Sequence, residues 1–419
     1  MRQYRVRGGN RIAGELCVGG AKNAVLPILA AVCLNESENI IHNCPPIADT
    51  FASIEILRRI GCKVELDGTV LKVDSSGELS PEIPDDIVCK MRSSILFMGA
   101  MLGRAGKVNI AMPGGCELGQ RAIDLHIFGL QKMGARICIQ DDKLYCEANE
   151  LRGADIHLHI ASVGATENLM LAAVRANGTT VIRNAAREPE IIDLAKFLTE
   201  MGAQIEGAGT GEITITGVRT LQKGPPHSIM PDRIVAGTYL VAAAMTGGCI
   251  TLKNIHPPDL APVIAKLREM GCIVHSGKHC VMLAAPTRLK ALPRLVTEVH
   301  PGFPTDMQAQ FVAALSIADG TSCVVETIFE NRHAHAAELN HMGADIQVSD
   351  NEREFTIRGI ESLAGEVVMA HDLRCGAALI LAALAAKGET VVQGAHHIQR
   401  GYAQIEKDLR RLGADIVLE

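Results

Sequence analysis

Leu130-Gln131-Lys132-Met133-Gly134-Ala135 is one of six copies of the phrase Leu-x-x-(Met/Ile/Leu)-Gly-(Ala/Cys), which returns about every 70 residues. The phrase is typical of a helix that ends at a glycine in the C′ position and turns into a strand. Its glycines are Gly61, Gly134, Gly202, Gly271, Gly343 and Gly413. We therefore expect six strands directly after them, at Lys63 to Leu66, Arg136 to Gln140, Gln204 to Glu206, Ile273 to His275, Asp345 to Val348 and Asp415 to Leu418.

A second phrase also recurs six times. It is an Ala-rich helix, apolar nearly all round, followed by a polar or glycine turn and a strand, and such a helix is expected to be buried. Its copies begin near Lys22, Ser93, Thr166, Ile234, Met307 and Gly376. The chain therefore predicts an α/β fold of six repeated α+β units.

Six units in 419 residues indicate two domains of three units each. The strand Tyr4 to Val6 precedes the first buried helix, and we expect it to pair with the last unit. The predicted domains are then residues 1–21 with 230–419, and residues 22–229.

Composition excludes several classes of protein. A net charge of −6 and 3% aromatic residues argue against nucleic-acid binding. The longest apolar run, Ala377 to Ala386, is too short to span a bilayer. Thirteen cysteines, an odd number without regular spacing, indicate reduced thiols and a cytoplasmic protein.

One cysteine stands in a distinctive loop. Cys116 follows Pro113-Gly114-Gly115 and lies five residues before Arg121. A thiol near fixed positive charge can have a lowered pKa and act as an acid or a nucleophile. The alternative is a small apolar residue in a turn, which most of the other cysteines must be.

Charged residues also stand at the starts of the buried helices. Lys22, Arg92, Arg233 and Arg374 are cations at positions that disfavour positive charge unless an anion is held there. Asp306 stands at the fifth start, where an ordinary N-cap is the alternative, as it is for Ser162 at the third. Closure of the two domains would bring Lys22, Arg92, Asp306 and Arg374 together.

The loops after the next strands add Arg121, Arg332 and Arg400. Arginines grouped with a thiol and a carboxylate suit a substrate that carries phosphates or carboxylates. No metal is expected, because His157 and His159 lack a third ligand at a suitable spacing. For His333, His335 and His341 we expect solvent-exposed or capping roles.

Six motifs together resemble those of the UDP-N-acetylglucosamine 1-carboxyvinyltransferases, a family of enolpyruvyl transferases, over essentially the whole chain. They are Gly19-Gly20-Ala21-Lys22-Asn23, Pro113-Gly114-Gly115-Cys116 with Arg121 and Asp124-Leu125-His126, Ser162-Val163-Gly164-Ala165-Thr166, Asn184-Ala185-Ala186-Arg187-Glu188-Pro189-Glu190, Phe303-Pro304-Thr305-Asp306-Met307-Gln308, and Glu330-Asn331-Arg332.

The resemblance implies a two-domain inside-out α/β barrel of six repeated units. It implies transfer of the enolpyruvyl group of phosphoenolpyruvate to the 3-hydroxyl of UDP-N-acetylglucosamine, with release of phosphate, in the first step of peptidoglycan synthesis. It implies no metal and no organic cofactor, and partners that are small-molecule substrates alone, with neither nucleic acid nor membrane. For the oligomeric state we take a monomer as the expectation.

The resemblance also assigns roles to residues. Cys116 is the general acid and the target of fosfomycin, and Asp306 is the base. Lys22, Arg121 and Arg400 hold phosphoenolpyruvate, and Asn23 contacts the amino sugar. The remaining substrate-binding positions are Arg92, Arg121, Ala122, Ile123, Asp124, Leu125, Ala161, Ser162, Val163, Gly164, Ile328, Arg332 and Arg374.

Several positions depart from the pattern of many relatives. Val235 and Gln399 stand where acidic residues are common, Cys375-Gly376 follows Arg374, and no lysine lies near Ile160. Two other interpretations stay open. The chain could be the sister enolpyruvyl transferase that acts on shikimate 3-phosphate, or a catalytically silent paralogue that binds UDP-sugar.

Overall fold

The computed structural model describes residues 2–89, 91–114 and 123–419. Within them, all six copies of the glycine phrase end a helix, and their glycines have φ between +93° and +116°. The helices are α2 (Ala48–Ile60), α5 (Asp124–Lys132), α7 (Pro189–Glu200), α9 (Ala261–Glu269), α11 (Ala334–His341) and α14 (Ile405–Arg411). The expected strands follow at once and are confirmed: β4 (Lys63–Asp67), β7 (Arg136–Gln140), β11 (Gln204–Glu206), β15 (Ile273–Ser276), β19 (Asp345–Val348) and β23 (Asp415–Leu418).

The six apolar helices are buried, as expected. In α10, for example, every residue is buried. Short 3₁₀ turns, η2 (Arg92–Ile95) and η4 (Thr305–Met307), lead into two of them. The six are α1 (Lys22–Ala31), α4 (Leu96–Ala105), α6 (Val163–Ala173), α8 (Arg233–Met245), α10 (Gln308–Leu315) and α12 (Leu373–Ala385).

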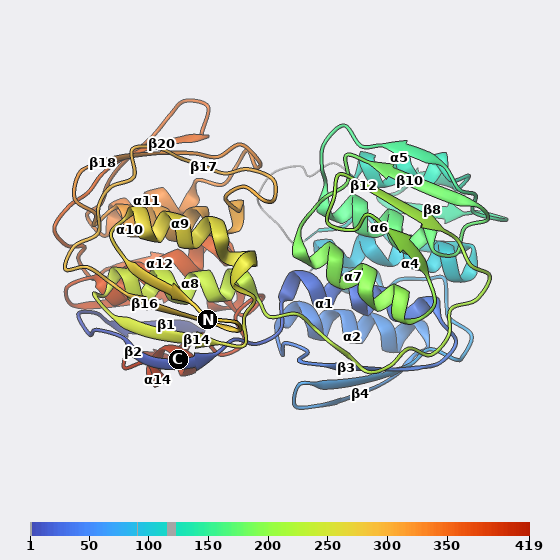
Figure 1. Ribbon diagram of the computed structural model, residues 1–419, viewed down its shortest axis with the longest axis horizontal. Helices are drawn as coiled ribbons and strands as arrows, with labels where there is room; N and C mark the ends of the chain where they lie inside the picture. The colour runs from blue at the N-terminus through green and yellow to red at the C-terminus, as the bar shows by residue number, and fades with distance from the viewer. Residues whose placement is uncertain (1, 90, 115–122) are drawn as a thin grey trace. The chain divides into compact units, whose positions relative to one another are not determined.

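The chain divides into two compact units (Figure 1). Unit 1 contains residues 2–19 and 231–419, and unit 2 contains the described residues from 20 to 230. The helices α8, α10 and α12 contact one another inside unit 1, and α1, α4 and α6 do so inside unit 2. Each unit has its own hydrophobic core around these helices, with the sheets outside them, so each is an inside-out α/β barrel.

The described strands form five four-stranded sheets and one three-stranded sheet. The orders in unit 1 are β21-β22-β1-β23, β15-β16-β14-β2 and β17-β18-β20-β19, and in unit 2 β11-β12-β10-β9, β13-β3-β5-β4 and β6-β8-β7. The strand β1 (Gln3–Arg7) pairs antiparallel with β22 and β23, which confirms the predicted pairing of the N-terminus with the last repeat.

The other strands are β2 (Ala13–Cys17), β3 (Glu38–His42), β5 (Val70–Asp74), β6 (Lys107–Ala111), β8 (Lys143–Glu147), β9 (Asp155–His157), β10 (Thr179–Arg183), β12 (Glu212–Thr216), β13 (His227–Ser228), β14 (Cys249–Lys253), β16 (Cys280–Ala284), β17 (Leu295–Val296), β18 (Thr321–Val325), β20 (Glu354–Arg358), β21 (Val367–Met369) and β22 (Glu389–Gln393). Short helical segments are α3 (Asp85–Val88), α13 (Ala395–Ile398), η1 (Val32–Leu34) and η3 (Pro257–Leu260). Among the described helices, none has the length and apolar character needed to cross a membrane.

Candidate active site

Asp306 in unit 1 is held by two arginines from different elements. It lies within η4, and its carboxylate accepts hydrogen bonds from Nη2 of Arg332 at Oδ1 (2.9 Å) and from Nη2 of Arg374 at Oδ2 (2.8 Å). Both arginines are buried, while the Asp306 side chain keeps 23% of its surface exposed. We call these three residues the Asp306 cluster. The N-cap residues of η4 and of α10 are Pro304 and Met307, so Asp306 is not the N-cap of either.

The charges of the Asp306 cluster fix its ionisation. Burial alone would raise the pKa of the Asp306 carboxyl, but the guanidinium groups of Arg374 and Arg332 outweigh it and hold that pKa well below its usual range. The same interaction keeps the pKa of Arg374 above its ordinary value, against the effect of burial. The cluster thus presents two cations and one carboxylate that remains ionised at neutral pH.

A buried polar network supports the cluster from the inside of unit 1. Nε2 of Gln310 donates to the carbonyl of Asp306 (3.0 Å) and to Oγ1 of Thr238 (3.2 Å). Oγ1 of Thr238 lies 2.8 Å from the hydroxyl of Tyr402 and donates to the carbonyl of Ile234 over the same distance. Because one hydroxyl has one proton, Tyr402 is the donor to Thr238, and its own oxygen is available to the nearby Arg374.

Lys22 in unit 2 forms a buried ion pair. Its Nζ lies 2.9 Å from Oδ2 of Asp49, with the lysine side chain 14% and the aspartate side chain 5% exposed. Lys22 opens α1, and Asp49 lies in the first turn of α2. At Lys22, as at Arg374, a carboxylate of the same unit offsets a cation at a helix start.

A second group in unit 2 surrounds His126 of α5. Nδ1 of His126 lies 2.9 Å from Nδ2 of Asn168, whose Oδ1 accepts from the backbone amide of Gly99 (2.7 Å). Burial, and then the charge of Arg92, lower the pKa of His126 to about 4, although Asp124 opposes them. The imidazole is therefore neutral and accepts at Nδ1, which places its proton on Nε2.

The same histidine faces the start of α6. A Cβ added at Gly164 would lie 3.6 Å from Nε2 of His126, and Ser162 caps the helix by accepting from the amide of Ala165 (3.3 Å). The structure thus gathers Arg92, Asp124 and the first turn of α6, three stretches that the sequence singled out, around one neutral histidine.

The other predicted site residues occupy these places. Asn23 is the second residue of α1, Ile123 and Leu125 flank the start of α5, and Ala161 and Val163 flank the cap of α6. Ile328 follows β18 and Arg400 follows α13. Cys116, Arg121 and Ala122 lie outside the described residues.

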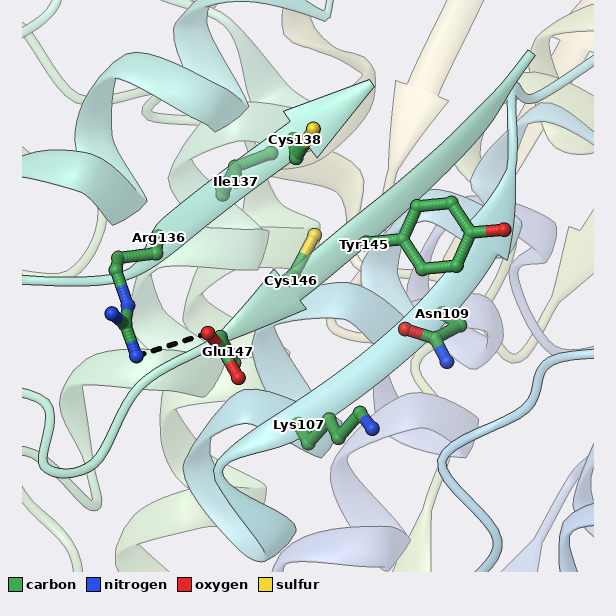
Figure 2. Close-up of a pocket in the computed structure, with 8 residues that line it drawn as sticks. All are labelled: Lys107, Asn109, Arg136, Ile137, Cys138, Tyr145, Cys146 and Glu147. Atoms are coloured by element: carbon green, nitrogen blue, oxygen red, sulfur yellow. Dashed lines mark ion pairs between the residues drawn. The ribbon is translucent and has the colours of Figure 1, made fainter. Parts of the chain in front are cut away.

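A pocket of about 450 Å³ lies elsewhere in unit 2 (Figure 2). It covers the sheet of β6, β8 and β7, and none of the predicted site residues lines it. Two of its charged side chains pair across the strands, with Nη2 of Arg136 lying 3.0 Å from Oε1 of Glu147. The predicted site residues that the structure describes therefore lie away from the lining of this pocket.

Two features differ from the sequence analysis or were absent from it. His335 is 2% exposed and stacks on Phe355 with ring centroids 5.5 Å apart, so the expected solvent or capping role is wrong for this residue. Asp49, the partner of Lys22, was missed, because an acidic residue in the first turn of a helix is common for electrostatic reasons alone. Among the residues described, no group of three or more His, Cys, Asp or Glu side chains could hold a metal ion.

Comparisons with known proteins identify the family of this chain. The family described as EPSP synthase (3-phosphoshikimate 1-carboxyvinyltransferase) matches residues 6–409. A protein of Caldanaerobacter subterraneus subsp. tengcongensis named UDP-N-acetylglucosamine 1-carboxyvinyltransferase 2 is 51% identical over 417 residues, covering 100% of this chain and 99% of the relative. A UDP-N-acetylglucosamine 1-carboxyvinyltransferase of Geotalea uraniireducens is 45% identical over 98% of both chains.

Solved structures agree with the inside-out barrel. The enolpyruvyl transferase NikO from Streptomyces tendae superimposes with a TM-score of 0.89 at 26% identity, covering 100% of this chain and 98% of NikO. EPSP synthase from Acinetobacter baumannii gives a TM-score of 0.75 at 18% identity over the whole of both chains, a likeness of fold. These findings confirm the resemblance drawn from the motifs. The chain belongs to the EPSP synthase family of enolpyruvyl transferases and, within it, to the UDP-N-acetylglucosamine 1-carboxyvinyltransferases.

Proposed function

We propose that this chain transfers the enolpyruvyl group of phosphoenolpyruvate to the 3-hydroxyl of UDP-N-acetylglucosamine and releases phosphate. The observation that carries the proposal is the Asp306 cluster, a carboxylate at hydrogen-bond distance from two buried arginines. Phosphoenolpyruvate brings a phosphate and a carboxylate, so fixed cations are what this reaction requires. The names of the close relatives supply the identity of the acceptor sugar.

The reaction is an addition followed by an elimination. In the addition, the sugar oxygen bonds to C2 of phosphoenolpyruvate, the methylene carbon gains a proton from Cys116, and the hydroxyl proton goes to Asp306. In the elimination, the methyl carbon returns a proton to the Cys116 thiolate, its C–H electrons form the new double bond, the C2–O bond to phosphate breaks, and the departing phosphate takes the proton held by Asp306. Lys22, Arg121 and Arg400 hold the anionic groups throughout. Arg92 and the first turn of α6 are proposed to hold the uridine diphosphate.

The depressed pKa of Asp306 bears on its role as the base. A carboxylate that is stabilised by two arginines is a weak proton acceptor. The anionic groups of the substrates compete for the guanidinium groups of Arg332 and Arg374. When the arginines also bind these anions, they stabilise the Asp306 carboxylate less, and Asp306 becomes a stronger base. We infer that substrate binding prepares the base as well as positioning the hydroxyl.

We also propose that the enzyme works in the cytoplasm as a monomer. All described cysteines are free, and six of them are more than nine-tenths buried without a disulfide, as in proteins of reducing compartments. The residues proposed for chemistry come from one chain.

The test is phosphate release from phosphoenolpyruvate, with UDP-N-acetylglucosamine or shikimate 3-phosphate as acceptor and with or without fosfomycin pretreatment. We expect release that depends on UDP-N-acetylglucosamine and is abolished by the drug. Release with shikimate 3-phosphate would identify the sister activity named in the family description. Binding of the nucleotide sugar without release would identify a silent paralogue.

A further inference from the structure

The residue that follows the central strand has the same role in three of the six repeats. In the first, third and fourth copies it is an asparagine with φ near +55°, namely Asn43, Asn184 and Asn254. Each donates from Nδ2 to a backbone carbonyl of the neighbouring chain segment, over 2.9, 2.9 and 2.7 Å respectively. In the sixth copy the position is Gly394, also with a positive φ (+76°), and in the second copy it is Met112. In the three copies with an asparagine, the position therefore joins two segments at the end of a sheet.

The fifth copy has a glutamate at this position. Glu326 follows β18 and is absent from the described residues with positive φ. The carbonyl of Thr297, which corresponds to the one that asparagine holds in the other copies, instead accepts from Oγ1 of Thr327 (2.6 Å). Because Thr327 binds the carbonyl of Thr297, the side chain of Glu326 is not needed for that contact.

The Glu326 carboxylate is buried and receives four hydrogen bonds. Its residue exposure is 1%. Oε1 accepts from Oγ1 of Thr297 (2.9 Å) and from the amides of Ile328 (2.8 Å) and Phe329 (3.1 Å). Oε2 accepts from Oγ1 of Thr305 (2.8 Å). Burying a carboxylate is unfavourable unless such donors surround it, so the arrangement is a specific one.

Thr305 connects this carboxylate to the Asp306 cluster. A carboxylate can only accept, so the Thr305 hydroxyl gives its proton to Glu326 and must accept from its other neighbour. That neighbour is Nη1 of Arg332, 2.6 Å away. The order is Arg332 to Thr305 to Glu326, and it fixes one end of a guanidinium whose other end, Nη2, holds Asp306.

We propose that Glu326 is a positioning residue for the enolpyruvyl transfer, which it serves by orienting Arg332 through Thr305 and by holding the backbone at Ile328. The proposal rests on the function proposed above. Glu326 contacts no reacting atom, and its effect passes through the Asp306 cluster. One buried carboxylate thus connects the substrate-binding backbone predicted at Ile328 with the proposed base.

Thr305→Val tests the connection, because it removes the hydroxyl and keeps the shape of the side chain. We expect kcat to fall about 10- to 100-fold, the scale of a slight misplacement of catalytic groups, with the KM for UDP-N-acetylglucosamine within about threefold of wild type. Thr305→Ser restores the hydroxyl and should recover activity. The matched control is Thr246→Val, which removes a hydroxyl bonded to the carbonyl of Ala242 (2.9 Å) in the same unit, away from the cluster, and should leave kcat unchanged.

Glu326→Gln and the double variant complete the test. The glutamine oxygen still accepts from Ile328 and Phe329, but its NH₂ group reverses the proton order at Thr305. The single variant should therefore behave like Thr305→Val, and the double variant should lose no more than the worse single variant. If Glu326 and Thr305 affected stability alone, the losses of kcat in the two single variants would add in the double variant. Those losses would also follow the fall in unfolding temperature.

The outcomes separate the two proposals. If wild-type protein releases no phosphate, the proposed function fails. If wild-type protein is active and Thr305→Val keeps its kcat, or the two losses add, the role of Glu326 is overturned.

Discussion

Arg374 and Asp306 come from two repeats of unit 1 that are 68 positions apart in the sequence, and they meet at 2.8 Å between Nη2 and Oδ2. Each residue stands at the start of a buried helix, or of the 3₁₀ turn that leads into one. The internal repeat therefore explains how a cation and an anion of such distant segments share one site. Arg332 then holds the second oxygen of the same carboxylate.

Asp306→Asn tests the role of that carboxylate in chemistry. The substitution keeps the shape of the side chain but removes its ability to take a proton. We expect kcat to fall about 10²- to 10⁴-fold, the contribution of a positioned general base. The dissociation constant of UDP-N-acetylglucosamine, measured by calorimetry, should stay near that of wild type. A loss of affinity equal to the loss of rate would refute the base role, because the residue would then act through binding alone.

Asp49→Asn tests the ion pair with Lys22. The asparagine keeps an oxygen near Nζ but lacks the charge that orients a buried ammonium group 2.9 Å away. We expect kcat/KM for phosphoenolpyruvate to fall about 10- to 100-fold, as for loss of a charge-assisted contact of about 1.5–3 kcal/mol. Affinity for the nucleotide sugar should change little.

The same helix offers a matched control for that experiment. Glu55 and Arg59 form an exposed pair on α2, with Oε1 and Nε 2.8 Å apart and both side chains more than 40% exposed. Exposed pairs contribute little. Glu55→Gln should therefore match wild type in kcat/KM, and an equal loss in both variants would assign the effect to the helix rather than to Lys22.

The sequence predicted the repeated elements well because their signals are local. The glycine phrase, as at Gly343, ends a helix in all six copies, and the apolar character of a helix such as α12 predicts its burial. The strand β1 could also be assigned to the last repeat. The order of strands within each sheet had no local signal, since it depends on contacts between distant segments.

The site was predicted in part for the same reason. The cations and Asp306 stand out because six copies can be compared position by position. Their partners do not stand out: Asp49 resembles any acidic residue in a first helical turn, and Glu326 differs from its counterparts only when the hydrogen bonds of the asparagines are known. For His335, helix packing determined the buried face, and no sequence signal did so.

Cys116→Asp tests the acid proposed for the addition. A carboxylic acid can also donate a proton, whereas it cannot be alkylated as a thiolate is. We expect the variant to release phosphate and to survive fosfomycin. Cys116 lies outside the described residues, so the test is kinetic, supported by mass spectrometry of the treated protein. An inactive variant that is still alkylated would contradict the assignment.

Cys375 provides the control for this labelling. It lies next to Arg374 of the Asp306 cluster, but it is 1% exposed, and burial, with the nearby charge of Asp372, raises the pKa of its thiol to about 12. A thiol of that kind has almost no thiolate at neutral pH. Cys375→Ala should therefore be inactivated by fosfomycin at the rate of wild type.

His227 predicts how the stability of unit 2 depends on pH. Its Nδ1 lies 3.2 Å from Oε2 of Glu200, and its Nε2 is at ion-pair distance, 3.2 Å, from Oδ1 of Asp193. Burial lowers the pKa of this histidine, but the two carboxylates outweigh it and raise the pKa above its ordinary value. A raised pKa means that the stabilisation is complete below the unfolded-state pKa of about 6.5 and is lost as the pH rises through the folded-state value.

His227→Gln should therefore lower the unfolding temperature more at pH 6 than at pH 8.5. His256→Gln, which breaks a pair with Asp259 in which the histidine side chain is 58% exposed, should change it little at either pH. Equal destabilisation by His227→Gln at both pH values would show that the side chain stabilises unit 2 by packing rather than by charge.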